Sequence, residues 1–472
     1  MTRAQELLVP QRARMLIVAA VVVVAALAGM VASTPVLALL LVIAGGLVVL
    51  RRQELMLFVI LFAALLVPIQ INTGTDVALN VTALLVPATA ILWFLSMILN
   101  GRISFLPSRL NRPLFVFLIA GLFSLLIGLV LWDPAVPRSS HFILVMLAQW
   151  AIVAFSAIAL LLTANLVRSE RLLRRLTFVF LLVGGTLALL TVLPGLGAAL
   201  QLHRLLTVAF IRAPLWVLLA ALSGGQLLFN QGLALRWRIY CLLVIATSLV
   251  YCFLLQRAVV SNWLGVMVVL FMLAWLRWKK LRPLAVLLII LLLATGILLP
   301  AVYEFAGGEA EWDESGGSRL ALIGRVLEMT WRHNPITGLG PAAYRPYGFV
   351  EPLHYGNALW WEPRISSHNN YVDLFAHFGM VGLAIFVWFA AETARLGLNL
   401  RARYTDGFAA GYVNAMVAAG AGSLVIMLLA DWILPFVYNI GFDGFQASVL
   451  VWLFMGGLVA LDNTGEGGHS YD

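Results

Sequence analysis

The segment Ser366–Tyr371 holds the residues best suited to chemistry, in the order Ser-Ser-His-Asn-Asn-Tyr. The imidazole of His368 has an ordinary pKa that allows it to act as a general base near neutral pH. Asn369 and Asn370 could orient this imidazole or bind hydroxyl groups. A structural alternative is also open, because the segment comes directly before an apolar stretch, and His368 could simply cap the helix that begins there.

Arginine is the second residue type that could do chemistry here. Its guanidinium group is permanently charged and binds phosphate oxygens through two parallel hydrogen bonds. Arg257 stands at the end of an apolar stretch, where the headgroups of a membrane would lie, and Arg319 opens an amphipathic segment. Charged residues at such positions are costly and usually functional. The alternative is that they contact only solvent or lipid headgroups.

Metal chemistry is not indicated by the sequence. We find no Asp-x-Asp in the segments expected on the outer side of a membrane, and no His/Cys cluster with ligand spacing. The two cysteines, Cys241 and Cys252, fall in one apolar run. In a helix they would be about 16 Å apart, which is too far for a disulfide. We interpret them as core residues.

The elements that position these residues are built for a bilayer. The 472 residues are 62% hydrophobic and 11% charged, against about 25% charged in soluble proteins. This composition excludes a string of soluble domains, a disordered chain and a disulfide-rich secreted protein. Because a crossing helix needs about 20 apolar residues, we expect an all-α integral membrane protein with about 12 to 14 transmembrane helices. The predicted spans are 15–32, 35–50, 55–71, 79–99, 113–132, 141–164, 176–197, 207–229, 238–255, 258–276, 284–303, 371–394, 408–432 and 440–461.

The basic residues predict the orientation of these spans. Cytoplasmic loops of membrane proteins are enriched in Lys and Arg, and every loop on one side is basic if both termini are cytoplasmic. The net charge of +9 therefore reflects topology and does not indicate nucleic-acid binding. The basic residues expected on the outer side are all arginines: Arg138, Arg204, Arg212, Arg257, Arg319, Arg325, Arg332, Arg345 and Arg364.

One long outer loop, 304–370, separates a transmembrane region 1–303 from a second one, 371–462, which a short cytoplasmic tail, 463–472, follows. Within the loop, Leu320, Ile323, Leu327 and Trp331 recur at helical spacing. This pattern predicts an amphipathic helix on the membrane surface, with Ser318 as its cap. Asn334–Pro341 predicts a tight turn. Aromatic residues that include Trp361 suit either a sugar-binding groove or a membrane interface.

Four short motifs, in this order along the chain, resemble the O-antigen ligase/polymerase-like superfamily of polytopic membrane glycosyltransferases. They are Arg257-Ala258, Arg319-Leu320, Pro335-Ile-Thr-Gly-Leu-Gly340, and His368-Asn369 followed by Gly379-Met-Val-Gly382. The sequence departs from the family pattern at Asn334, which separates the family's His and Pro, at Gln256 in place of Ser, and at Ile323, a position that is often Trp. These departures affect the assignment to a subfamily more than the assignment to the superfamily.

The resemblance implies an inverting, metal-independent glycosyltransferase of the bacterial inner membrane that needs no cofactor. Such an enzyme moves a glycan from a polyprenyl-diphosphate carrier to a hydroxyl of a glycan or glycolipid acceptor, as an O-antigen ligase does with a lipid A-core sugar. It implies His368 as the general base, and Arg257 and Arg319 as the groups that stabilise the leaving diphosphate. The further substrate contacts that we expect are Arg204, Arg212, Arg325, Asn369, Asn370, Tyr371 and Trp361.

Two alternatives stay open. A repeat-unit polymerase for O-antigen, capsule or exopolysaccharide would use the same donor with a different acceptor. A polysaccharide or lipid exporter or flippase is the non-enzymatic alternative. Transporters place ionisable residues or broken helices near the middle of the membrane. Here the polar features gather in one outer loop, which favours an enzyme that works at the membrane surface.

Overall fold

The computed structural model of the chain describes residues 52–74, 77–101, 103–202, 206–311, 316–356, 358–360 and 365–464. The chain divides into two units, Met1–Met56 and Leu57–Asp472, and the account below concerns the second. Several predictions lie outside the described residues: the spans 15–32 and 35–50, the tail from 465 onward, and the substrate contacts Arg204 and Trp361.

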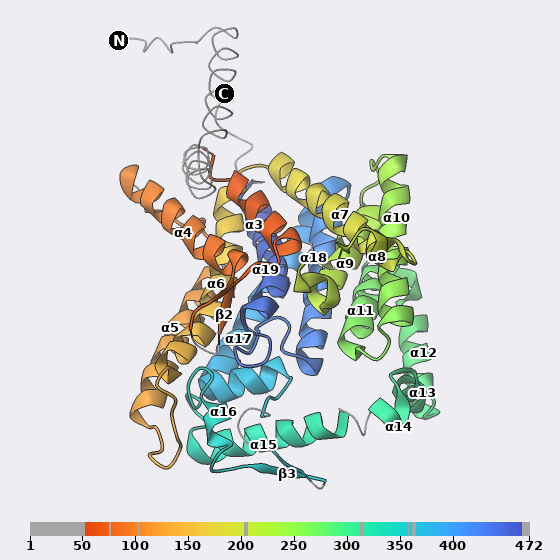
Figure 1. Cartoon of the computed structure of the whole chain (residues 1–472). Helices are drawn as coiled ribbons and strands as arrows, with labels where there is room; N and C mark the ends of the chain where they lie inside the picture. Colours follow the sequence, from red (N-terminus) through yellow and green to blue (C-terminus); the bar gives the residue numbers. More distant parts are fainter. Residues whose placement is uncertain are drawn as a thin grey trace, which may run out of the picture. The chain divides into compact units, whose positions relative to one another are not determined.

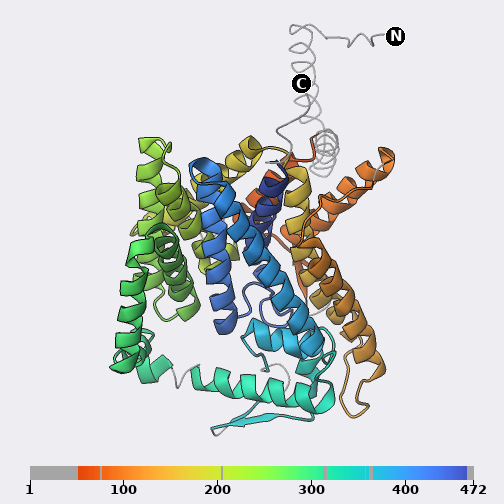
Figure 2. The same ribbon diagram turned by 180° about the vertical axis from the view of Figure 1, so that it is seen from behind.

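Long α-helices dominate the described chain (Figures 1 and 2). Nine of its helices are long and apolar enough to cross a membrane: α4 (Val81–Leu99), α5 (Asn111–Val130), α6 (Phe142–Leu166), α7 (Glu170–Val192), α10 (Leu235–Leu249) with the π-helical turn η3 (Val250–Leu255), α11 (Val260–Arg277), α17 (Asn370–Arg403), α18 (Gly407–Leu429) and α19 (Gly441–Thr464). Helices α12 (Arg282–Ala294) and α13 (Leu298–Phe305) form a bent pair, while α3 (Leu55–Leu66) and α9 (Ala213–Phe229) are apolar but shorter.

The remaining elements are short. They are β1 (Gln70–Asn72), which pairs antiparallel with β2 (Ala78–Asn80), α8 (Leu196–Ala199), η2 (Val208–Ile211), η4 (Lys279–Leu281), α14 (Gly308–Glu311), α15 (Gly317–His333), α16 (Tyr344–Tyr347), and β3 (Leu353–Tyr355), which pairs antiparallel with β4 (Ala358–Trp360).

The expected all-α membrane fold is confirmed. Each predicted span from residue 55 onward has a helix or the bent pair as its counterpart. Only nine helices of the described chain reach a crossing length by themselves, fewer than the predicted 12 to 14. One boundary matters for function, because α18 ends at Leu429 although the predicted span continued to residue 432. Asp431 and Trp432 therefore lie in the α18–α19 loop, residues 430–440.

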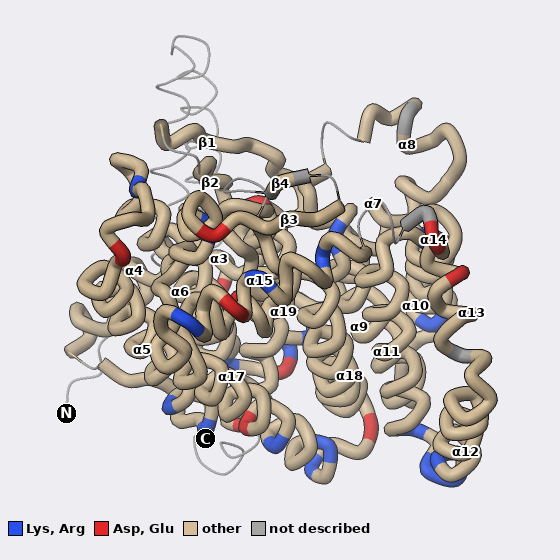
Figure 3. Tube along the Cα trace, turned by 90° about the horizontal axis from the view of Figure 1, so that it is seen from below, with Lys and Arg blue, Asp and Glu red and all other residues tan. Residues whose placement is uncertain are grey.

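Close helix crossings hold the core together. A Cβ atom on Gly225 of α9 would lie 2.3 Å from the carbonyl oxygen of Gly411 on α18. Likewise, a Cβ atom on Gly456 of α19 would lie 2.2 Å from the carbonyl oxygen of Leu160 on α6. Membrane helices associate through such small residues, since lipid provides little hydrophobic driving force between them. Figure 3 shows charged positions mainly at helix ends and connecting segments, with long uncharged stretches between them.

Helix α15 lies crosswise over one end of the longer helices (Figures 1 and 2). It confirms the predicted amphipathic helix, but its apolar residues form two faces. Leu322, Val326 and Met329 are buried against the protein, while Leu320 and Trp331 of the predicted stripe are 60% and 65% exposed. The predicted cap is wrong, because the helix already begins at Gly317 and has no side-chain cap bond, which places Ser318 inside the first turn.

Candidate functional site

His368 lies at the entry to α17 in an unusual backbone conformation. Its φ angle is 48°, in the left-handed region that non-glycine residues seldom adopt. The helix is capped by the next residue, Asn369, whose side-chain oxygen accepts hydrogen bonds from the backbone N–H groups of Tyr371 (2.9 Å) and Val372 (3.2 Å). Asn369 thus takes the structural role that was the alternative for His368. The imidazole is half-buried and serves no capping function.

The two asparagines connect this entry segment to the end of α18 and to the α18–α19 loop. Asn369 Nδ2 donates to the carbonyl of Leu428 (2.9 Å), and Asn370 Nδ2 donates to that of Leu434 (2.7 Å). The oxygen of Asn370 accepts from the backbone N–H groups of Ile433 (3.1 Å) and Leu434 (3.2 Å). Both side chains are buried. These bonds make the two residues part of the frame that holds the loop beside His368.

A hydrogen-bonded chain joins His368 to a buried carboxyl group. Asn439 Nδ2 donates to Asp431 Oδ1 (2.8 Å) and lies 3.2 Å from His368 Nδ1. Asp431 is 1% exposed, and its other oxygen accepts from the backbone N–H of Phe436 (3.0 Å). Because an amide NH₂ group only donates, we assign Nδ1 as the acceptor nitrogen of the neutral ring, with the proton on Nε2.

Burial and two opposing charges act on His368. Burial lowers the pKa of its imidazole below the ordinary value, the carboxylate of Asp431 raises this pKa, and the guanidinium of Arg319 lowers it again. Burial also raises the pKa of Asp431, although the positive charge of His368 acts in the opposite direction. Arg319, at the start of α15, therefore lies within range to influence the pKa of His368.

Arg212 reaches the same loop from the start of α9. Its guanidinium carbon lies 4.4 Å from the centre of the Trp432 ring, a cation–π contact, and its charge interacts with Asp431 and Asp443. Its Nε atom is buried and has no hydrogen-bond partner among the described residues. A buried N–H group without a partner is costly, so an anionic group bound here would satisfy a donor that the described chain leaves open.

Arg257 lies in the turn between η3 and α11, and its side chain is exposed. Trp263 Nε1 donates to the carbonyl of Arg257 (2.9 Å), and Ser261 Oγ accepts from Trp432 Nε1 (2.9 Å). The first bond links the turn to α11, and the second links α11 to the α18–α19 loop. Among the described interactions, the guanidinium group of Arg257 makes no ion pair and no hydrogen bond. The structure thus ties the backbone of Arg257 to the site and leaves its charge exposed.

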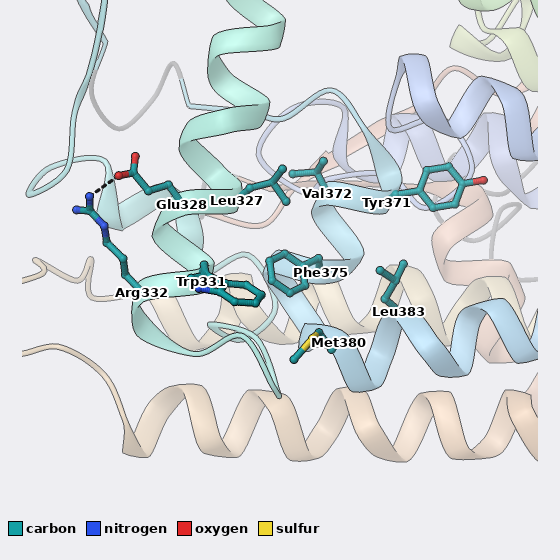
Figure 4. Close-up of a pocket in the computed structure, with 9 residues that line it drawn as sticks. All are labelled: Leu327, Glu328, Trp331, Arg332, Tyr371, Val372, Phe375, Met380 and Leu383. Atoms are coloured by element: carbon teal, nitrogen blue, oxygen red, sulfur yellow. Dashed lines mark hydrogen bonds and ion pairs between the residues drawn. The ribbon is translucent and has the colours of Figure 1, made fainter.

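The remaining predicted residues that the structure describes, Arg325 and Tyr371, make contacts of their own. Arg325 of α15 forms ion pairs with Glu328 of the same helix (2.9 Å) and with Glu351, which follows α16 (3.7 Å). Tyr371 donates from its hydroxyl to the carbonyl of Leu424 (2.8 Å). Its ring lines an apolar groove of about 630 Å³ together with Leu327, Glu328, Trp331, Arg332, Val372, Phe375, Met380 and Leu383 (Figure 4).

A break in helix α17 is hydrogen-bonded to the predicted tight turn. Gly379 interrupts α17 with a φ angle of 67°. The free backbone groups at the break bond to the turn: Leu339 N–H to Ala376 (2.8 Å), Met380 N–H to Pro335 (2.9 Å) and Val381 N–H to Ile336 (3.2 Å). A Cβ atom on Gly379 would lie 2.1 Å from the oxygen of Ile336. Two of the sequence motifs, Pro335–Gly340 and Gly379–Gly382, are therefore two halves of one contact.

Our sequence analysis missed Asp431, Asn439 and Trp432. The span predicted to end at residue 432 placed Asp431 and Trp432 inside the membrane, so neither was considered for the site. A carboxylate within an apolar span is itself a signal of function, and that signal could have identified Asp431. Asn439 gives no such signal, because its role depends on a fold that brings it next to His368, 71 residues away in the chain.

Comparison with known families agrees with the motifs. Residues 242–387 match the family model described as O-antigen ligase, and this segment contains Arg257, Arg319 and His368. Comparison with curated proteins gives no match. The family match confirms the resemblance to the O-antigen ligase/polymerase-like superfamily and supports an enzyme of that kind. Together with the apolar helices, it indicates a multi-pass membrane protein.

Proposed function

We propose that this protein transfers a glycan from a polyprenyl-diphosphate carrier to an acceptor hydroxyl at the extracytoplasmic surface of the bacterial inner membrane. The observation that carries the proposal is the chain His368–Asn439–Asp431 with Arg319 near its histidine end. This arrangement combines a base with a cation in the segment that matches the O-antigen ligase family.

His368 removes the proton of the acceptor hydroxyl as that oxygen attacks the anomeric carbon. The new C–O bond forms while the bond between this carbon and the diphosphate oxygen breaks, so the diphosphate leaves with the electron pair and the configuration inverts. The acceptor hydroxyl takes the place of Asn439 as the donor to Nδ1 of His368 and gives its proton to this nitrogen, which carries the available lone pair in the assigned tautomer. The carboxylate of Asp431 stabilises the resulting imidazolium, because opposite charges attract strongly in a partly buried site.

Arginines stabilise the negative charge on the leaving diphosphate. Arg319 and Arg257 are the proposed main contacts, and Arg212 adds a buried N–H group without a partner in the described chain. A guanidinium group binds phosphate oxygens through two bonds and provides charge without a metal ion. In the described part of the chain, no three His, Cys, Asp or Glu side chains are grouped as metal ligands would be. We propose a metal-independent reaction, in which these arginines provide the positive charge.

Reconstituted protein tests this proposal. The donor is a polyprenyl-diphosphate glycan, and the two acceptors, offered separately, are a lipid-core oligosaccharide and a second carrier-linked glycan unit. Transfer to the first acceptor indicates a ligase, which is our proposal, whereas transfer only to the second indicates the polymerase alternative. Absence of transfer to either, with donor translocation across the bilayer, would identify a transporter and overturn the proposed enzyme.

The His368→Ala variant tests the base. We expect a loss of at least about 100-fold in kcat, because general base catalysis contributes about that much or more, with carrier binding retained. His354→Ala is the matched control, since His354 is exposed on β3 and has no described contact with the site. Full activity of His368→Ala would remove the base assignment.

A further inference from the structure

A buried cluster of Tyr344, Ser367 and Asp373 lies directly behind His368. The Tyr344 hydroxyl donates to Asp373 Oδ1 (2.9 Å), and Ser367 Oγ donates to the same oxygen (2.6 Å). The backbone N–H of Ser367 contacts the Tyr344 hydroxyl (3.4 Å). Tyr344 and Ser367 are fully buried and Asp373 is 3% exposed. The three side chains come from α16, the entry segment and the first turn of α17, so they join the elements on which His368 depends.

These bonds fix the backbone on both sides of His368. On one side, Ser367 is held by its N–H and by its hydroxyl group. On the other side, the N–H of Asn369 donates to Ser367 Oγ (3.1 Å), and the cap bonds of Asn369 hold it at the end of α17. His368 lies between these two anchored residues with its φ angle of 48°. A left-handed conformation costs a non-glycine residue about 1–3 kcal/mol and persists where its surroundings impose it.

The hydrogen bonds that Asp373 accepts indicate a role in fixing the position of neighbouring residues. Both hydrogen bonds converge on Oδ1, while Oδ2 is buried and has no hydrogen-bond partner among the described residues. Replacing such a buried polar cluster by apolar side chains is often neutral or favourable for stability, so packing alone does not account for it. Burial raises the pKa of Tyr344 well above its usual value, which keeps its hydroxyl a neutral donor.

We infer that Asp373 is a positioning residue for His368, which it holds in its left-handed conformation through Ser367 and Tyr344 so that Nδ1 of the imidazole faces Asn439 and, in its place during the reaction, the acceptor hydroxyl. The inference rests on the proposed function of His368 as the base. Asp373 touches no substrate in this account. It acts as a hydrogen-bond acceptor, and its charge is not among those that act on His368 directly, which are the charges of Asp431 and Arg319. Its charge does interact with that of Asp431, so the test below separates the two effects.

Two substitutions separate acceptor geometry from charge. Asp373→Asn keeps an oxygen that can accept from both hydroxyl groups but removes the charge, whereas Asp373→Leu removes the acceptor at similar size. We expect Asp373→Asn to keep kcat within about threefold, and Asp373→Leu to lower kcat by about 100-fold, the size of effect that a small displacement of a catalytic group produces. The KM for the donor should change in neither variant.

Tyr344→Phe and Thr330→Val complete the series. Tyr344→Phe removes one of the two hydroxyl groups and should lower kcat less than Asp373→Leu does, so it tests the inference even if the leucine variant does not fold. Thr330→Val is the control, because Thr330 is also buried but bonds within its own helix, to Val326 (2.8 Å). Its kcat should be that of the unmodified protein.

The measurements are kcat and donor KM of the purified, monodisperse variants, the pH profile of kcat, and the rate at which diethyl pyrocarbonate modifies His368, followed by mass spectrometry. We expect diethyl pyrocarbonate to modify His368 faster in Asp373→Leu. In Asp373→Asn, we expect the acid limb of the pH profile of kcat to stay unchanged. Unchanged kcat and unchanged modification in Asp373→Leu and Tyr344→Phe would overturn it. A shifted acid limb in Asp373→Asn would also overturn it, because Asp373 would then act through charge.

The two hypotheses can fail separately. If His368→Ala is fully active, the proposed base is wrong, and the modification rate of His368 still reports whether Asp373 holds it. If His368→Ala is inactive while Asp373→Leu retains full kcat and the ordinary modification rate, only the positioning inference fails.

Discussion

At the scale of single residues, the proposed function depends on the electrostatic interaction between the buried carboxylate of Asp431 and the half-buried imidazole of His368. Asp431 and His368 approach each other through Asn439. Burial lowers the pKa of His368, and the negative charge of Asp431 partly offsets this effect. The proposed base acts in its neutral form, so we expect the acid limb of the pH–rate profile of kcat/KM to report the pKa of His368 in the free enzyme.

The Asp431→Asn substitution should move this acid limb to lower pH. Without the negative charge, the pKa of His368 falls further, and the neutral base persists to more acidic conditions. The plateau rate should also fall, since the imidazolium formed during transfer loses its stabilising partner. Asp133→Asn is the control with an unchanged limb, because Asp133 is not among the charges that act on His368. A limb that moves to higher pH in Asp431→Asn would contradict this account of the site.

At the scale of elements, the site stands on the contact between the broken helix α17 and the turn 335–340. The Gly379→Ala substitution should destabilise the protein by more than about 2 kcal/mol, because the new Cβ would lie 2.1 Å from a backbone oxygen and would also occupy a left-handed conformation. The fraction of monodisperse protein in detergent and its Tm measure this loss. Gly407→Ala is the control: Gly407 also has a positive φ angle, but nothing lies within 4 Å of its Cβ position. If Tm falls equally in the two variants, the left-handed backbone conformation causes the destabilisation, and the collision of the new Cβ with the backbone oxygen does not.

The helices could be predicted from the sequence, and the long-range contacts could not. Membrane-crossing helices and the amphipathic helix follow from patterns of residues that are close in the sequence: apolar runs of crossing length, and the spacing of Leu320, Leu327 and Trp331. Both predictions are confirmed. Glycines 338 and 340 also predicted a turn, and both have positive φ angles. The partner of that turn, the break at Gly379, could not be derived, because isolated glycines inside an apolar run do not reveal which distant carbonyl approaches them.

The same reason explains which members of the candidate site could be predicted from the sequence. His368 and Arg319 stand in recognisable local motifs, and the structure brings them close enough for their charges to interact. Asp431 was missed because hydropathy extended its span by a few residues. The buried bonds of Asp373 with Tyr344 and Ser367 join residues 29 and 6 positions apart, and no sequence period indicates such a cluster.

At the scale of the whole molecule, the proposed function requires that α15 and the site face the extracytoplasmic side. The distribution of basic residues favours this orientation, with Lys279 and Lys280 on the cytoplasmic side. Cys241 and Cys252 are both free and fully buried. The chain therefore offers a low background for labelling cysteines introduced at exposed positions.

Single cysteines introduced at His354 on β3 and at Lys280 in η4 test the orientation in intact cells. Both positions are exposed in the structure, so access to either depends only on its side of the membrane. A membrane-impermeant maleimide should label His354→Cys from outside, and Lys280→Cys only after permeabilisation. The unmodified protein is the control and should stay unlabelled in both conditions. Because a polyprenyl-diphosphate donor would have to reach Arg319 and His368 from the side that carries β3, the reverse labelling pattern would place the site in the cytoplasm and contradict the proposed extracytoplasmic transfer.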